Sequence, residues 1–211
     1  MSSEPILRLA ARGDGVTASG RYAAQAAPGD MLDAAGVLTA GPHRVTPVCR
    51  HVPDCGGCQL QHVDEESLAA FITDRIGSAL SAQGVTGFDL RVPHMSPASA
   101  RRRVSLRAER RGKQILLGFN AAKSHRIIDL AQCPVMHPAL EALIKPLRAL
   151  LGLCLADRRG ANIRMTLADQ GVDLLIAGVE AEAKGKSIAQ LEQERDAALM
   201  RILATRTALD T

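Results

Sequence analysis

The alternation of apolar and polar positions divides the first part of the chain into a glycine-rich β region and one long helix. Between residues 5 and 40, short apolar pieces are separated by the turn-forming groups GDG, SGR, PGD and AGPH, which is typical of a small β unit. Residues 64–84 begin with acidic side chains, end at a glycine and place apolar residues at helical spacing. Those apolar positions are Leu68, Phe71, Ile72, Ile76 and Leu80. This second pattern predicts a helix.

Two pairs of strands are predicted in the second part of the chain. In residues 101–119, apolar and polar side chains alternate, and a turn at 111–113 leads into a second apolar run. A period of two predicts a β-hairpin with its arginines on the outer face. Residues 161–179 repeat the pattern, with a turn that begins at Asp169.

Two further helical segments complete a predicted α+β fold. Residues 137–152 have a helical pattern that Pro146 must kink or divide, because proline lacks an N–H and clashes with the preceding turn. A last helix is predicted to begin near Ser187, because Gln190 three residues later fits a capping box. With 211 residues, 46% of them hydrophobic, the chain is expected to form two small domains.

Composition narrows the class of protein. The longest apolar runs, such as residues 147–156, are far shorter than the roughly 18 residues that a membrane span needs, and the N-terminus has no basic start followed by an apolar stretch. We therefore expect a soluble cytoplasmic protein without membrane contact, and a monomer. In a reducing cytosol, a tight group of cysteines is expected to bind metal or do redox chemistry.

Positive charge is concentrated in one segment. Residues 101–126 contain nine Lys or Arg residues and one acidic residue, whereas residues 1–48 have no net charge. Aromatic residues make up only 2% of the chain, so any binding of nucleic acid must depend on charge rather than on base stacking. The candidate RNA contacts are Arg101, Arg103, Arg107 and Lys123. The alternative is an ordinary solvated face, and Arg126 can instead pair with Asp129.

Four of the five cysteines have a spacing that suggests a metal centre. Cys49, Cys55 and Cys58 lie within ten residues around a Gly-Gly pair, and Cys133 is followed by proline. This pattern resembles the thiolate arrangement of four-iron, four-sulfur ferredoxin sites. Structural zinc is the rival interpretation, although zinc ligands more often come as two closely spaced pairs. Unliganded cysteines are the third possibility.

Three other residues could bind a metal by their side-chain type but are not expected to be ligands. His51 and His62 flank the cysteines, but four thiolates already complete a ligand set. Cys154 lies in the apolar run LGLCLA and is expected to be a small hydrophobic core residue. No residue is assigned a catalytic role.

Five segments, in order, carry a more specific resemblance than any single motif. They are LRLAARGDGV, APGDML, GPHRVTPVCRHVPDCGGCQLQH, SPASARRRVSLRA and LLGFNAAKSHRIIDLAQCPVMHPALEALI. Together they resemble the first half of the iron-sulfur RNA uracil-5-methyltransferases that act on 23S ribosomal RNA. The resemblance implies that Cys49, Cys55, Cys58 and Cys133 hold a 4Fe-4S cluster.

The resemblance also implies the domain organisation. Residues 1–48 are expected to form a TRAM domain, a small OB-like β-barrel, and residues 49–211 a central domain of mixed sheet and helices that holds the cluster. In the family, a third domain binds S-adenosylmethionine and supplies a cysteine nucleophile and a carboxylate base. Its Gly-rich loop and Asn-Pro-Pro segment are not found in the sequence, so the chain is expected to be inactive alone.

The function implied is therefore the RNA-recognition and iron-sulfur half of an S-adenosylmethionine-dependent 23S rRNA (uracil-5-)-methyltransferase. Because residues 1–48 are short and neutral, RNA affinity is assigned mainly to the arginine hairpin. The alternative is a stand-alone iron-sulfur or zinc RNA-binding module without catalysis. A small electron carrier is a further possibility, but it would not need the arginines.

Overall fold

The computed structural model describes residues 3–179 and Gln193. The described residues form two compact units. Unit 1 contains residues 3–53 and 58–96, and unit 2 contains residues 54–57 and 97–179. The units are defined by packing alone, so the predicted functional domains, residues 1–48 and 49–211, stay a prediction.

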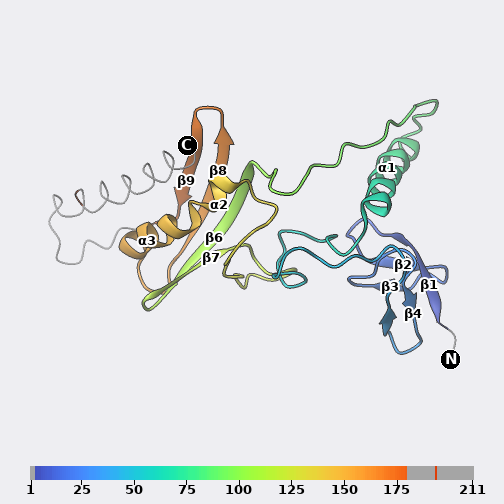
Figure 1. Cartoon of the computed structure of the whole chain (residues 1–211), viewed down its shortest axis with the longest axis horizontal. Coiled ribbons are helices and arrows are strands. Elements are labelled where there is room, and N and C mark those ends of the chain that lie inside the picture. Colours follow the sequence, from blue (N-terminus) through green and yellow to red (C-terminus); the bar gives the residue numbers. More distant parts are fainter. Residues whose placement is uncertain (1–2, 180–192, 194–211) are drawn as a thin grey trace. The chain divides into compact units, whose positions relative to one another are not determined.

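Unit 1 contains the β unit that the sequence predicts. Five short antiparallel strands form one sheet in the order β3-β2-β1-β4-β5, curled by a bulge in β1 between Ile6 and Arg8 (Figure 1). The strands are β1 (Glu4–Leu9), β2 (Gly15–Thr17), β3 (Tyr22–Ala23), β4 (Met31–Leu32) and β5 (Leu38–Thr39). The N-terminal part of the chain is therefore barrel-like, as expected.

A buried carboxylate organises the loops of this sheet. Asp30 is fully buried and accepts hydrogen bonds from the N–H groups of Ala27, at 2.7 Å, and Gly41, at 2.8 Å. The guanidinium of Arg44 forms an ion pair with the same carboxylate. A side chain at Gly41 would collide with the carbonyl of Gly29, so the two loops approach as closely as glycine allows.

The predicted helix is confirmed as α1 (Glu65–Ala82). Asp64 caps it by accepting a hydrogen bond from the N–H of Ser67 at 2.9 Å. None of the α1 residues is buried. Phe71 packs against a small cluster in unit 1, whereas Ile76 is 48% exposed. The apolar stripe that predicts the helix is therefore only partly covered in the described structure.

Unit 2 contains both predicted hairpins in one antiparallel sheet, in the order β7-β6-β8-β9 (Figure 1). The strands are β6 (Arg103–Arg111), β7 (Gln114–Gly118), β8 (Gly160–Ala168) and β9 (Gly171–Ala177). The central strands β6 and β8 pair along seven residues, from Arg103 opposite Thr166 to Glu109 opposite Gly160. Each hairpin supplies one of the two central strands of the sheet.

One face of this sheet packs against two helices. They are α2 (Pro138–Glu141) and α3 (Ile144–Cys154). The helical segment is thus divided, as the sequence predicts, and α3 begins two residues before Pro146. Pro146 is tolerated in the first turn of α3, where its missing N–H has no helical partner. The core includes Val104, Leu106, Leu117, Leu140, Leu147, Leu151, Ile163 and Met165. The helix predicted from Ser187 lies outside the described residues.

The α+β fold class is therefore confirmed. No helix in residues 3–179 has both the length and the apolar character that crossing a membrane requires. The opposite face of the unit 2 sheet bears several of the basic side chains. We call it the open face, because in residues 3–179 its side chains are exposed or half-buried.

Candidate metal centre and nucleic-acid interface

The Cys55-Gly56-Gly57 loop lies directly against the segment that follows β7. The N–H of Gly56 donates to the carbonyl of Asn120 at 2.9 Å, and a side-chain carbon at Gly56 would lie only 2.8 Å from that oxygen. A side-chain carbon at Gly57 would lie 3.0 Å from the ring of Phe119. A side chain at Gly56 would collide with this backbone oxygen, whereas one at Gly57 would press on the Phe119 ring, so glycine favours the close approach of the loop at both positions.

Cys55 has features expected of a metal-binding thiol. Its side chain is buried, and the N–H of Gly57 points at its Sγ at 3.4 Å. Backbone N–H groups directed at sulfur are among the contacts by which proteins tune iron-sulfur sites.

Cys133 is buried in the main core of unit 2. Its N–H donates to Oε1 of Glu141 at 2.9 Å, which anchors its loop to α2. Phe119 packs against this core and also against the small cluster that contains Cys55. The two cysteine loops of unit 2 therefore share one aromatic neighbour.

Arg101 ties the same two loops together. Its backbone N–H donates to the carbonyl of Val135 at 2.9 Å, in the loop after Cys133. Its guanidinium donates to the carbonyl of Gly57, at 3.3 and 3.2 Å, and lies 6.0 Å from the centre of the Phe119 ring. Arg101, predicted as an RNA contact, thus has a structural role beside the cysteines, and its contact with RNA stays a prediction.

The other two predicted ligands belong to unit 1. Cys49 is buried and its N–H donates to Oε1 of Gln61 at 3.2 Å, whereas Cys58 is half-buried. In residues 3–179, no three His, Cys, Asp or Glu side chains form a group that could hold a metal ion. Ligation of one cluster by all four cysteines therefore stays a prediction.

Cys154 occupies the position expected of a core residue. It lies at the end of α3 and packs, partly buried, against the main core. Burial raises the pKa of its thiol, which disfavours the thiolate form that attacks substrates or binds metals.

Several arginines of the basic segment already have partners within unit 2. Arg102 pairs with Asp169, and Arg111 pairs with Glu109. Arg110 donates to the carbonyls of Gly152, at 3.0 Å, and Leu155, at 2.8 Å. The local excess of positive charge therefore overstates how many of its guanidinium groups are available to a ligand.

Asp129, which the sequence offers as a partner for Arg126, forms its ion pair with Arg148 instead. Asp129 pairs with Arg148 from α3, at 2.5 Å, and accepts a hydrogen bond from the N–H of Leu117 at 2.9 Å. Arg148 also donates to the carbonyls of Ile115 and Leu117. Asp129 pairs with Arg148 rather than with Arg126, which is nearer in sequence, because several carbonyls hold the Arg148 guanidinium in place.

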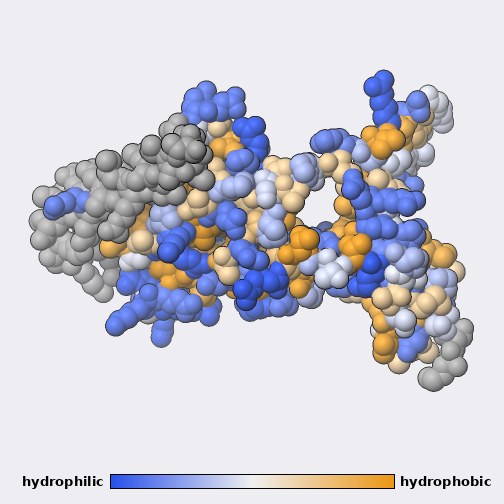
Figure 2. Space-filling model, viewed as in Figure 1, coloured by the Kyte–Doolittle hydropathy of each residue, from blue (hydrophilic) through white to orange (hydrophobic). Residues whose placement is uncertain are grey.

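Arg103 and Arg107 lie on the open face of the sheet, as the hairpin pattern predicts. Arg103 is exposed, and Arg107 is half-buried and donates to Oδ1 of Asn162 at 2.8 Å. Lys123 is exposed in the loop after β7, with a positive φ of 54°. Figure 2 shows hydrophilic side chains over much of the visible surface of unit 2.

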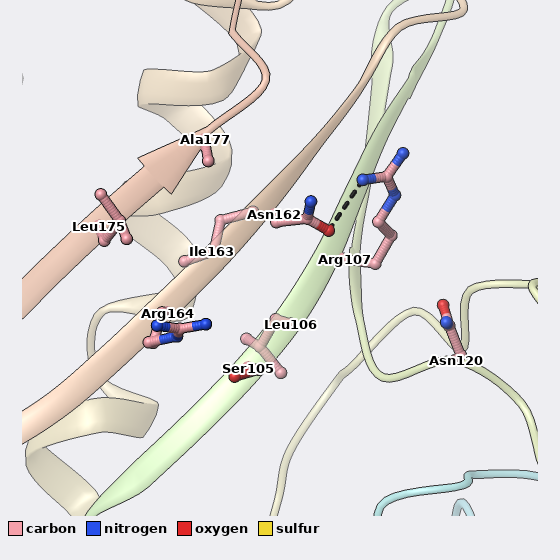
Figure 3. A pocket seen from close by; sticks show the side chains of 9 residues that line it. All are labelled: Ser105, Leu106, Arg107, Asn120, Asn162, Ile163, Arg164, Leu175 and Ala177. Atoms are coloured by element: carbon pink, nitrogen blue, oxygen red, sulfur yellow. Dashed lines mark hydrogen bonds between the residues drawn. The ribbon is translucent and has the colours of Figure 1, made fainter.

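A hollow of about 400 Å³ lies on the open face (Figure 3). Arg107 and Arg164 are the charged residues that line it, and the polar ones are Ser105, Asn120 and Asn162. Leu175 and Ala177 from β9 add apolar surface.

Comparison with curated proteins finds bacterial RNA methyltransferases. The chain is 44% identical over 171 residues to an uncharacterized RNA methyltransferase of Zymomonas mobilis, an alignment that covers 81% of this chain and 43% of that protein. It is 35% identical over 143 residues to the 23S rRNA (uracil(1939)-C(5))-methyltransferase RlmD of Halomonas elongata, over 66% of this chain and 29% of that protein. The chain belongs to this family of RNA methyltransferases. No family model matches it.

The chain spans less than half the length of these two relatives, 43% and 29%. A second RlmD, from Pectobacterium atrosepticum, is 32% identical over 150 residues. The predicted resemblance is therefore confirmed at the level of the family.

Several polar or charged residues of the hollow, among them Asn120, Asn162 and Arg164, are not among the site residues predicted from the sequence. Asn162 and Arg164 lie on β8, where the alternation in ANIRMTLA already places them on the face opposite Ile163 and Met165. The alternation alone therefore indicates that these two side chains share the face of the sheet that bears Arg103 and Arg107. Asn120 follows β7, and no periodic pattern marks it.

Proposed function

We propose that this chain is the RNA-recognition and iron-sulfur part of an S-adenosylmethionine-dependent methyltransferase that methylates C5 of a uridine in 23S rRNA. The observation that carries the proposal is the similarity to RlmD relatives combined with the arginines on the open face of unit 2. The task assigned to this chain is to bind and orient RNA. S-adenosylmethionine supplies the methyl group when bound, and no residue of this chain is assigned to its binding.

The proposal includes a 4Fe-4S cluster held by Cys49, Cys55, Cys58 and Cys133. Support comes from their spacing, from the buried thiols of three of them and from the Gly57 N–H directed at Cys55. Such a cluster crosslinks four thiolates and can exchange one electron. We further propose that the curled sheet of unit 1 is a short TRAM-like domain.

RNA binding is assigned to the basic side chains of unit 2. Guanidinium and ammonium groups bind phosphates without reading sequence, and each neutralised phosphate releases counterions. The leading contacts are Arg103 and Arg107 on the open face and Lys123 in the loop after β7. Arg101 remains in the proposed set, although Gly57 and Phe119 engage its guanidinium.

A salt titration of RNA affinity tests this assignment. The triple variant Arg103→Ala, Arg107→Ala, Lys123→Ala should reduce the steepness of log K against log salt by about 2, because each phosphate of single-stranded or looped RNA contributes about 0.7. The measurement is fluorescence anisotropy with a ribosomal RNA hairpin. Binding to unrelated RNA sequences should weaken to a similar extent.

The matched control removes three arginines of the same unit that pair with carboxylates. The three pairs are Arg102 with Asp169, Arg111 with Glu109 and Arg158 with Asp157. Replacing these three arginines by Ala changes the net charge as much as the first triple variant does. This control should leave the slope nearly unchanged. Equal slopes in the two triple variants would mean that Arg103, Arg107 and Lys123 form a merely solvated face.

A further inference from the structure

The hollow on the open face of unit 2 is built from two rows of residues across neighbouring strands. In the strand register, one row consists of Arg107 on β6, Asn162 on β8 and Ala177 on β9. The other row consists of Ser105, Arg164 and Leu175 on the same three strands. Asn120 borders this surface from the segment after β7 (Figure 3). Because each side chain except Asn120 stands on a regular strand, the sheet holds the arrangement in place before a ligand binds.

The charged side chains that line the hollow in residues 3–179 have one sign. They are Arg107 and Arg164, and no carboxylate of these described residues lines it. Arg107 uses one nitrogen to donate to Asn162, and Arg164 is exposed with no hydrogen bond from its guanidinium to any other part of the described chain. The guanidinium of Arg107 lies over Gly160 and Asn162, so Arg164 is the group of the hollow that is complementary to a phosphate.

The remaining lining suits a nucleobase. Leu175 is 51% exposed and, with Ala177, offers an apolar surface for a base or ribose. The side-chain amides of Asn120 and Asn162 can donate to and accept from a base edge. A volume of about 400 Å³ is in the range of small-molecule sites and admits one nucleotide rather than a helix.

We propose that this hollow binds one unpaired RNA nucleotide, with its phosphate at Arg164, its ribose near Leu175 and its base directed across Asn162 toward Asn120. This inference rests on the proposed function and adds a specific site to it. An unpaired nucleotide fits because sequence-specific RNA recognition targets bases outside the helix, which amides and guanidinium planes can reach. A paired base in an A-form helix would hide the edge that Asn120 needs.

The test compares a short unpaired oligoribonucleotide with an RNA duplex of the same length, by anisotropy of the full chain. The wild type should prefer the unpaired RNA. Arg164→Gln should weaken binding of the unpaired RNA and lower the salt slope by about 0.7, one phosphate contact. Asn120→Ala should leave the slope unchanged and reduce the preference for unpaired RNA by about fivefold, the loss of one base-edge contact.

Two control variants match these changes outside the hollow. Arg158→Gln removes the same charge from an exposed arginine of unit 2, and Gln114→Ala removes an exposed amide at the start of β7; neither should alter the slope or the preference. If Arg164→Gln behaves like Arg158→Gln, or Asn120→Ala weakens unpaired and duplex RNA alike, the nucleotide site is wrong. Full competition by polyglutamate would also overturn it, in favour of an acidic protein partner.

Failure of the site and failure of the proposed function give different results. If Arg103→Ala, Arg107→Ala, Lys123→Ala lowers the slope while Arg164→Gln and Asn120→Ala change nothing, RNA recognition stands and the hollow is not its nucleotide site. If the wild type binds neither RNA, the proposed function fails, and the site fails with it.

Discussion

His62 is a buried histidine in unit 1 whose environment disfavours the charged form. It is 2% exposed, and neither ring nitrogen makes a hydrogen bond of regular geometry in the described residues. Burial lowers the pKa of His62. The charge of Arg44 also lowers this pKa. The backbone of Ala26 and the carboxylate of Asp30 raise it, but less than burial and Arg44 lower it. The imidazole is therefore expected to stay neutral in the folded unit.

This predicts that unit 1 loses stability in mild acid. A histidine in the unfolded chain takes up a proton near pH 6.5, whereas folded His62 resists it, so the unfolded state binds more protons as the pH falls. The stability from neutral His62 is complete above about pH 6.5 and decreases below it, by up to about 1.4 kcal/mol per pH unit. His62→Leu should remove this pH dependence.

Urea denaturation at several pH values checks the prediction, with the fluorescence of Tyr22 as the signal. Tyr22 is the only tyrosine, the chain has no tryptophan, and Tyr22 lies on β3 of unit 1. The control is His94→Leu, because His94 is an exposed histidine of the same unit. An unchanged pH dependence in His62→Leu would show that other groups are responsible.

At the scale of elements, periodicity predicts most of the described structure. Both hairpins, α1 and the division of the helix near Pro146 follow from local signals, namely a period of two, a capped helical stripe and a proline. The partners of charged side chains do not follow from such signals. Asp129 pairs with Arg148, because the tertiary fold decides which guanidinium can reach several carbonyls at once.

The same reasoning explains why the candidate site is predicted only in part. The cysteine spacing and the arginines of β6 are visible in the sequence, whereas the hollow depends on the pairing of β6 with β8, which is set by the fold. Arg101 is the clearest case. It lies in an arginine run that suggests a ligand, yet its guanidinium contacts Gly57 and Phe119.

The contacts of Arg101 predict a structural loss that its neighbour does not share. Arg101→Ala removes charged hydrogen bonds to a loop carbonyl and should lower the free energy of unfolding of unit 2 by about 2 kcal/mol. Arg102→Ala breaks only an exposed pair with Asp169 and should cost less than about 1 kcal/mol. Urea denaturation followed by circular dichroism measures both. Equal losses would mean that the tie between the two cysteine loops contributes little.

At the scale of the whole molecule, the four predicted ligands are divided equally between the units. Cys49 and Cys58 belong to unit 1, and Cys55 and Cys133 to unit 2. Binding of one cluster by all four would make metal content depend on cysteines from both units.

The iron content of anaerobically purified protein is the measurement that tests the account most directly. The wild type should contain about four irons and show a broad absorbance at roughly 400 nm. Cys133→Ser and Cys49→Ser, one ligand from each unit, should each lose most of the iron. Cys154→Ser should keep the wild-type content, because Cys154 packs against the core. Colourless protein with one zinc per chain, or full iron in Cys133→Ser, would contradict the proposed iron-sulfur RNA methyltransferase.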